Sequence, residues 1–187
     1  MKYVDDYIMV QNLMPVELCK SLIRENSLPE KKWSKHSWSS YDQDASPQKK
    51  ELDIIYATRE QYKMIEKYLL EAIRKYQQKY SHEGERLQRW IGHISMVRFN
   101  RYKVGTHMQT HYDHIHTIFD GKYKGIPILS FIGLLNDNYQ GGEFLCRKKE
   151  IKLTRGDIVL FPSNFMYPHR IKEITKGIRY SFVGWAF

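Results

Sequence analysis

Four polar residues in the second half of the chain have the types and spacing of a metal site: His111, Asp113, His169 and Arg179. Side chains two residues apart on a β-strand leave the same face, about 6.6 Å apart along the backbone, so His111 and Asp113 can converge on one cation. A third ligand must come from another strand, and His169 can supply it. Two imidazoles and a carboxylate occupy one face of an octahedral ion and leave the opposite face open. The pattern therefore predicts non-haem iron(II) chemistry.

A second group of residues predicts an anion site near this ion. Arg179 and Ser181 share one face of the expected last strand. A guanidinium that points into a β-barrel needs an anion, since an unpaired buried charge is costly. A dicarboxylate would satisfy it, because the planar fork of arginine meets a carboxylate through two hydrogen bonds and Ser181 can donate a third. Asn100 and Tyr102 share a face of an upstream strand, and they either point to solvent or line a polar cavity.

The elements that must position these residues divide into two helices and a set of strands. Pro15 precedes an apolar pattern that predicts a short amphipathic helix. Thr58 and Gln61 form a capping box before an apolar stripe, which predicts a second helix near 59–80 that covers a sheet. From about residue 91 the chain changes to short segments rich in Ile, Val, Phe, Tyr and Leu, separated by turn residues. These expected strands are 91–103, 127–136, 143–153, 156–162 and 177–187.

The even spacing of these segments is typical of an antiparallel jelly roll. We expect an α+β fold in which N-terminal helices pack on one sheet of a double-stranded β-helix core. Residues 1–187 are expected to form a single domain, with 1–90 as helical support and substrate-side segment and 91–187 as the jelly-roll core. The polar segment 31–51 is either a lid or a surface loop, of which we favour the loop, and 31–51 and 114–125 could form the rims of an acceptor cleft.

The composition of the chain limits its compartment and its partners. A content of 42% hydrophobic residues is typical of a globular protein. The first ten residues lack a signal-peptide pattern and no apolar run is long enough to span a bilayer, so we expect a cytoplasmic protein without a membrane partner. Cys19 and Cys146 are far apart and fit a reducing compartment. The net charge of +9 favours anionic partners, and we prefer a small dianionic co-substrate to a nucleic acid.

Three stretches of the sequence resemble the core of the iron(II)- and 2-oxoglutarate-dependent dioxygenases, especially their prolyl 4-hydroxylase-like branch. The resemblance spans about residues 91–187 and is specific because its pieces occur in the right order and at roughly the right intervals. They are NRYKVGTHMQTHYDH, GLLNDNYQGGEF and GDIVLFPSNFMYPHRIKEITKGIRYSF. The resemblance implies that the catalytic iron ligands are His111, Asp113 and His169. It also implies that Arg179 holds the distal carboxylate of 2-oxoglutarate, and that the co-substrate is bound further by Ser181, Tyr102 and Asn100.

The same resemblance implies an enzyme that uses Fe(II), 2-oxoglutarate and O2, releases succinate and CO2, and hydroxylates a C–H bond. Ascorbate is a candidate reductant. The expected acceptor is a prolyl or related residue in a peptide, or a free amino acid. Leu134 departs from the branch, which often has a polar co-substrate contact there.

Three alternatives stay open from the sequence. Asn100, Arg101 and Tyr102 also resemble the lead-in of AlkB-type nucleic-acid demethylases or hydroxylases, although Ser181 and Trp185 depart from the C-terminal Arg-x-Asn-x-x-x-Arg motif of that family. A catalytically silent jelly-roll binding protein could instead keep a metal for stability. A zinc pair formed with His107 is disfavoured, because the surrounding β pattern argues against the helix that it needs.

Overall fold

The computed structural model of the protein describes residues 6–37, 50–80, 91–113 and 127–187. This part of the chain contains two helices, α1 (Val16–Asn26) and α2 (Arg59–Tyr80). The strands that it contains are β1 (Met9–Asn12), β2 (Ser34–Lys35), β3 (Asp53–Tyr56), β4 (Arg98–Tyr102), β5 (Met108–His111), β6 (Leu129–Leu134), β7 (Gln140–Gly141), β8 (Phe144–Cys146), β9 (Lys149–Ile151), β10 (Asp157–Pro162), β11 (His169–Ile171), β12 (Ile174–Lys176) and β13 (Arg179–Ala186).

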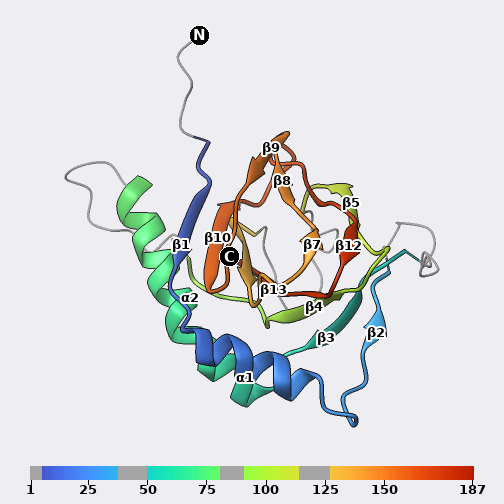
Figure 1. Ribbon diagram of the computed structural model, residues 1–187. Helices are drawn as coiled ribbons and strands as arrows, with labels where there is room; N and C mark the ends of the chain where they lie inside the picture. Colours follow the sequence, from blue (N-terminus) through green and yellow to red (C-terminus); the bar gives the residue numbers. More distant parts are fainter. Residues whose placement is uncertain (1–5, 38–49, 81–90, 114–126) are drawn as a thin grey trace.

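The strands form two main antiparallel sheets that enclose a common interior. The larger sheet has the order β1-β10-β6-β13-β4-β3-β2, and the smaller sheet has the order β5-β11-β8-β9. Strands β7 and β12 form a separate pair. Figure 1 shows β10, β13 and β4 on one side of the interior and β8, β9 and β5 on the other side. The described residues thus form mostly antiparallel sheets with two helices, as the predicted α+β class requires.

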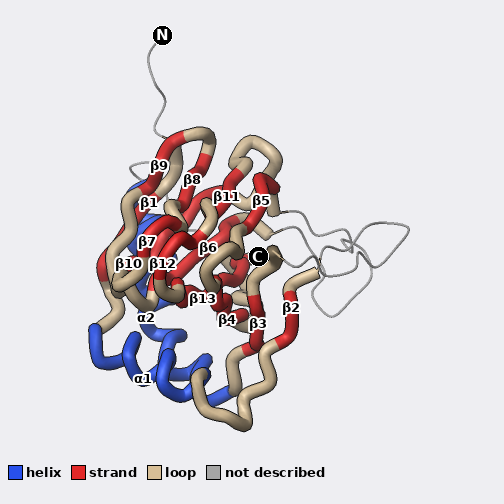
Figure 2. The backbone as a smooth tube through the Cα atoms, turned by 45° about the vertical axis from the view of Figure 1, so that its right-hand side comes forward, coloured by secondary structure: helices blue, strands red, loops and turns tan. Residues whose placement is uncertain are grey.

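Both helices pack on the outer face of the larger sheet. The buried faces of α1 and α2 contribute Cys19, Leu22 and Leu69 to one apolar cluster that also contains Phe131 and Phe182 from the sheet. Figure 2 shows α1 at the lower end of the molecule, away from β5, β8 and β9, and α2 running behind the strands of the larger sheet. The helices therefore pack on the larger sheet and not on the smaller one. The space between the two sheets is separate from the helix–sheet core.

The capping box predicted for α2 is confirmed. The backbone N–H of Gln61 donates to Thr58 Oγ1 at 3.2 Å, and the backbone N–H of Thr58 donates to Gln61 Oε1 at 3.1 Å. These reciprocal bonds satisfy two amide groups that a helix start would otherwise leave without partners. The observed start at Arg59 and end at Tyr80 agree with the predicted range.

Alternation along β4 and β13 decides which residues face the interior. The two strands pair antiparallel, with Arg179 opposite Tyr102 and Ser181 opposite Asn100. Phe99 and Phe182 belong to the helix-side core. Neighbouring side chains on a strand leave opposite faces. The adjacent polar residues of β4 and β13 therefore point into the space between the sheets; they are Asn100, Tyr102, Arg179 and Ser181. Of the two alternatives left open by the sequence, the polar cavity is the correct one.

The structure contains short strands that the sequence did not predict. Strands β1, β2 and β3 precede residue 91 and belong to the larger sheet, and β4 begins at Arg98 rather than near residue 91. Segments of two to four residues carry too little periodicity to be predicted, because their pairing partners lie far away in the sequence. Of the proposed rims at 31–51 and 114–125, residues 38–49 and 114–125 lie outside the described residues. Neither described helix is both long and apolar enough to cross a membrane.

Candidate active site

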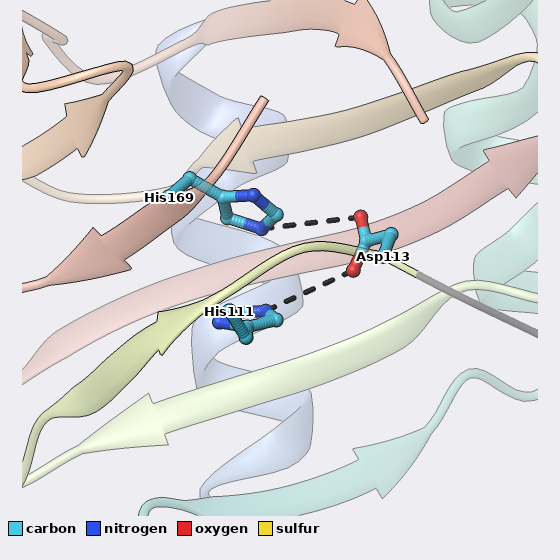
Figure 3. A group of neighbouring side chains, drawn as sticks. All are labelled: His111, Asp113 and His169. Carbon is cyan, nitrogen blue, oxygen red and sulfur yellow. Dashed lines mark ion pairs between the residues drawn. The ribbon is translucent and has the colours of Figure 1, made fainter. Parts of the chain in front are cut away.

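Antiparallel pairing of two short strands brings the predicted metal ligands together. His111 ends β5, His169 begins β11, and the two residues lie directly opposite each other. Asp113 follows two residues after His111, beyond the end of β5 rather than on the strand as predicted. One ligand atom from each of the three side chains nevertheless lies within 4.8 Å of the others. The three side chains point toward one another in Figure 3. The pairing of β5 with β11, which the sequence did not reveal, is what joins a local motif to a distant histidine.

The separations within this group fit a shared ion better than direct hydrogen bonds. Nε2 of His111 lies 3.8 Å from Oδ1 of Asp113, and Nε2 of His169 lies 3.9 Å from Oδ2. Both separations are too long for hydrogen bonds. Two ligands that are each about 2.1 Å from one ion can lie up to about 4.2 Å apart. The observed spacing therefore leaves room for one cation between the imidazoles and the carboxylate.

Hydrogen bonds to the backbone fix the tautomer of both imidazoles. Nδ1 of His111 lies 2.9 Å from the carbonyl oxygen of Gln109, and Nδ1 of His169 lies 3.0 Å from that of Tyr167. A carbonyl oxygen can only accept, so each Nδ1 carries the proton and each Nε2 keeps its lone pair toward Asp113. Burial, followed by repulsion from His169, lowers the pKa of His111 to about 4. Both features favour metal binding, which needs a neutral imidazole.

Two serines that the sequence analysis missed hold the carboxylate in place. Ser130 Oγ, on β6, donates to Oδ2 of Asp113 at 2.5 Å. Ser163 Oγ lies 3.0 Å from the same hydroxyl. Because the Ser130 proton is used on the carboxylate, Ser163 must donate in the second bond. The only available signal was a polar residue at an inward position of an otherwise apolar strand, LSFIGL.

Arg179 is a buried cation with an unsatisfied donor. Its side chain is 1% exposed, and Nη1 donates to Ser181 Oγ at 2.8 Å. The guanidinium carbon lies 5.2 Å from the ring centre of Tyr102, and Nε has no hydrogen-bond partner. Among the described residues no carboxylate pairs with Arg179. A buried guanidinium without a carboxylate partner is suited to bind a carboxylate of a ligand. The ligand would supply both the counter-charge and the acceptor that Nε lacks.

One cavity contains all of these groups. It comprises about 440 Å³ of space free of protein atoms, part of it open to solvent. Leu134 is fully buried beside Ser181 and offers no polar contact. The polar side chains that line the cavity are Arg98, Asn100, Tyr102, His111, Asp113, Ser130, His169, Arg179 and Ser181. All seven predicted site residues therefore share one pocket, together with Arg98 and Ser130, which were not predicted.

Several other residues of this half of the chain either do not line the cavity or have a structural role. His107 forms an isolated bridge with Glu51 and does not line the cavity. Gly141 and Gly142 adopt φ values of 75° and 68°, a left-handed conformation that glycine permits in a tight turn. Trp185 lines the cavity as well as packing in the sheet. The additional histidines at 114 and 116 lie outside the described residues.

The fold and the cavity together define a class of protein: two facing antiparallel sheets that hold a preorganised two-histidine, one-carboxylate set and a buried anion site in one pocket. Comparison with known families agrees with this class. Residues 97–187 match the model of the 2OG-Fe(II) oxygenase superfamily. The chain belongs to this superfamily over those residues, which include every predicted site residue.

The sequence is also similar to that of several PKHD-type hydroxylases. A PKHD-type hydroxylase of Crocosphaera subtropica is 35% identical over 100 residues, which cover 50% of this chain and 43% of that protein. A PKHD-type hydroxylase of Gluconobacter oxydans is 33% identical over 95 residues, which cover 47% of this chain and 41% of that protein. The chain thus spans less than half the length of these curated relatives.

Solved structures with a similar fold include prolyl hydroxylases. A prolyl-4-hydroxylase of Pseudomonas putida has a TM-score of 0.68 and 16% identity, with 97% of this chain and 92% of that chain covered. A prolyl hydroxylase of Trichoplax adhaerens, in complex with a hypoxia inducible factor peptide fragment, has a TM-score of 0.66 and 16% identity, with 97% and 84% covered. At this identity the likeness establishes a shared fold.

Proposed function

We propose that the protein is an Fe(II)- and 2-oxoglutarate-dependent dioxygenase that hydroxylates a C–H bond. The observation that carries this proposal is the buried guanidinium of Arg179, which has no carboxylate partner among the described residues and shares a cavity with His111, Asp113 and His169. A metal kept only for stability needs no buried cation beside it. An oxygenase that binds a dicarboxylate does, because the ligand offsets the charge.

Each residue of the cavity has a role in this proposal. His111, Asp113 and His169 would hold Fe(II), which with O2 and 2-oxoglutarate supplies the oxidising chemistry and yields succinate and CO2. The backbone carbonyls behind the imidazoles keep both rings in the ligating tautomer. Ser130 restrains rotation of the carboxylate.

The far end of the cavity would bind the co-substrate. Arg179 and Ser181 would take its distal carboxylate, with Tyr102 and Asn100 beside it. The wall around them is completed by apolar residues that limit the access of water, including Met108 and Ile132. Exclusion of water strengthens the attraction between a guanidinium and a carboxylate.

The fold and domain proposals go with the activity. We propose that the two facing sheets are the double-stranded β-helix of this superfamily, and that the chain is a single domain. Two observations support this: prolyl hydroxylase structures align with 96–97% of the chain, and strands from residues 9–56 share one sheet with strands from residues 98–186.

The proposed acceptor is a prolyl or related residue, in a peptide or as a free amino acid. Support comes from the fold shared with prolyl hydroxylases and from the peptide bound to the Trichoplax protein. Competition among proline-containing peptides, free amino acids and methylated oligonucleotides for stimulated 2-oxoglutarate turnover tests this choice. Stimulation by oligonucleotides alone would assign the protein to nucleic-acid demethylation instead.

Anaerobic spectroscopy tests the enzyme proposal itself. Addition of Fe(II) and 2-oxoglutarate is expected to produce a visible metal-to-ligand charge-transfer band, and succinate should form under air. His111→Ala and Asp113→Ala should lose the band. Arg179→Gln should need a higher 2-oxoglutarate concentration to form it.

The matched control is His107→Ala, which removes a nearby histidine that does not line the cavity. It should keep the band at wild-type intensity. The enzyme proposal fails if the wild-type protein forms neither the band nor succinate.

A further inference from the structure

A second guanidinium enters the same cavity and has no carboxylate partner in the part of the chain that the structure describes. Arg98, on β4, lines the pocket with the predicted ligands, and its Nε donates to Asn100 Oδ1 at 3.1 Å. Within the described ranges no carboxylate forms an ion pair with it. Burial lowers the Arg98 pKa, and the charges of Tyr102, Tyr56 and Asp113 oppose this effect. Arg98 therefore resembles Arg179 in having no carboxylate partner among the described residues, but it is only partly buried, whereas Arg179 is fully buried.

The neighbouring arginine on the same strand shows the contrast. Arg101 faces the other side of the sheet, where Nη2 lies 2.9 Å from Oδ2 of Asp53 and the guanidinium stacks 4.3 Å from the ring centre of Trp33. The outward arginine of β4 is thus neutralised by its own chain. The inward arginine is held in orientation by Asn100 and remains available for an external anion.

The register of the sheet places Arg98 between Arg179 and the metal ligands. Arg98 pairs with Val183, four residues after Arg179 on β13, which is about 14 Å along the strand. Two residues further, Trp185 pairs with Ser130, the residue that holds Asp113. Arg98 therefore lies between the level of Arg179 and the level of the carboxylate ligand.

The charges of the loaded site leave Arg98 uncompensated. The inference drawn from this rests on the proposed function. Fe(II) and Asp113 with the two neutral histidines carry one net positive charge, and Arg179 adds another. Doubly ionised 2-oxoglutarate cancels both. Arg98 then contributes one positive charge that no other described group in the cavity offsets, and this charge becomes expensive when a bound acceptor covers the partly exposed guanidinium without offering it an anion.

We propose that Arg98 is a specificity-determining residue that binds a carboxylate of the acceptor substrate. The acceptor then carries a negative charge close to the carbon that is hydroxylated. Two sources have this chemistry: the α-carboxylate of a free amino acid, and an acidic side chain next to the target residue in a peptide. A guanidinium can meet either one through two charge-assisted hydrogen bonds.

Matched acceptor pairs test this proposal by binding rather than by turnover. Calorimetry would be performed anaerobically on protein loaded with Fe(II) and 2-oxoglutarate. The first pair is L-proline and L-prolinamide, and the second is acetyl-Pro-Glu-amide and acetyl-Pro-Gln-amide. The wild-type protein is expected to prefer the carboxylate member of one pair by about tenfold or more. The pair that shows the preference identifies the source of the carboxylate.

Arg98→Gln should abolish this preference while the affinity for 2-oxoglutarate stays within about twofold of wild type. Arg98→Lys should retain part of it, because the charge remains but the planar fork is lost. Lys103→Gln is the matched control, since it removes one positive charge from an exposed position just after β4, outside the cavity. It should keep the full preference.

Three outcomes would overturn the proposal. The wild-type protein could show no carboxylate preference in either pair, or Arg98→Gln could keep the preference. Arg98→Gln could also weaken 2-oxoglutarate binding strongly, which would assign Arg98 to the co-substrate. In each case a normal charge-transfer band in the wild-type protein would show that the dioxygenase function itself stands.

Discussion

Main-chain carbonyls, rather than acidic side chains, orient the two imidazoles of the candidate metal site. In each case the acceptor is the carbonyl two residues earlier, at Gln109 for His111 and at Tyr167 for His169. The orientation of the rings therefore depends on the local backbone around β5 and β11. The carboxylate is different, because Asp113 depends on a hydroxyl from a third strand, at Ser130.

Ser130→Ala is expected to weaken Fe(II) binding without removing a ligand. Loss of the 2.5 Å hydrogen bond lets the Asp113 carboxylate rotate, and such supporting contacts typically change metal affinity by about 10- to 100-fold. Titration with Fe(II) under anaerobic conditions, or with Mn(II) by electron paramagnetic resonance, measures this. Ser163→Ala, which removes only the donor to Ser130, should have a smaller effect. Equal metal affinities in Ser130→Ala and wild type would contradict this role.

The helices act on the site only through the larger sheet. Gln61 joins the two helices, because its Nε2 donates to Glu25 and Asn26 at the end of α1 while its backbone and side chain form the capping box of α2. The start of α2 is therefore fixed to the end of α1. This arrangement holds the helix layer in place on the outer face of the sheet.

Thr58→Ala is expected to lower the free energy of unfolding by about 1 kcal/mol, the usual effect of losing an N-cap hydroxyl. Chemical denaturation followed by circular dichroism measures the change. Thr58→Ser keeps the hydroxyl and should retain most of the stability. Because Thr58 lies on the helix side, Fe(II) affinity should not change in either variant. A Thr58→Ala variant as stable as wild type would show that the capping box contributes nothing.

Strand β3, next to the edge strand β2, carries the buried carboxylate of Asp53, which contacts three cations. Burial alone would raise the Asp53 pKa, but hydrogen bonds from Lys35, Lys103 and Arg101 lower it on balance. A group with a lowered folded-state pKa stabilises the protein above its unfolded pKa, near 3.9, and that stabilisation is lost as the pH falls through the folded value. Asp53 thus contributes to the attachment of β2 and β3 at neutral pH.

Asp53→Asn is therefore expected to lower the melting temperature at pH 7, with a difference from wild type that shrinks as the pH falls below about 4. Thermal melts between pH 3 and pH 7 measure this. Glu71→Gln is a suitable control, because Glu71 forms exposed ion pairs on α2 that contribute little. A difference that stays constant with pH would contradict the assigned role of the Asp53 charge.

At the scale of the whole molecule, two glycines allow the helix layer and the sheet to pack closely. Phe182 on β13 lies opposite Gly133 on β6, and Phe131 on β6 lies opposite Gly184 on β13. A Cβ atom at Gly133 would lie 2.0 Å from Phe182 Cζ, and one at Gly184 would lie 2.4 Å from Phe131 Cζ. Each phenylalanine ring therefore fills the space over a glycine of the neighbouring strand.

Gly133→Ala is expected to destabilise the fold by about 1–3 kcal/mol, because the added methyl group displaces a fully buried ring. The midpoint of urea unfolding measures the loss. Gly92→Ala is the matched control, since its nearest neighbour atom lies 3.9 Å from the added Cβ. It should change stability by less than about 0.5 kcal/mol. Similar midpoints for Gly133→Ala and wild type would contradict the packing argument.

The sequence by itself determined those features that depend on neighbouring residues. The His111-x-Asp113 pair, the shared face of Arg179 and Ser181, the capping box at Thr58 and the helix near 59–80 follow from local periodicity, and the structure has all four. Each of the five segments predicted as strands after residue 91 contains a strand for the same reason, but 143–153 divides into β8 and β9, and the short strands β5, β7, β11 and β12 lie outside the predicted segments. Local patterns are readable because the geometry of helices and strands repeats every few residues.

Only the tertiary structure decided which distant groups meet. It paired His111 with His169, turned Asn100 and Tyr102 inward, and placed Ser130 against Asp113. It also showed that Arg98 shares the cavity and lacks a carboxylate partner among the described residues. Strand pairing and the inward face are set by burial and by hydrogen bonds between segments up to about 150 residues apart, as for β1 and β10, and no local pattern records which segments will pair.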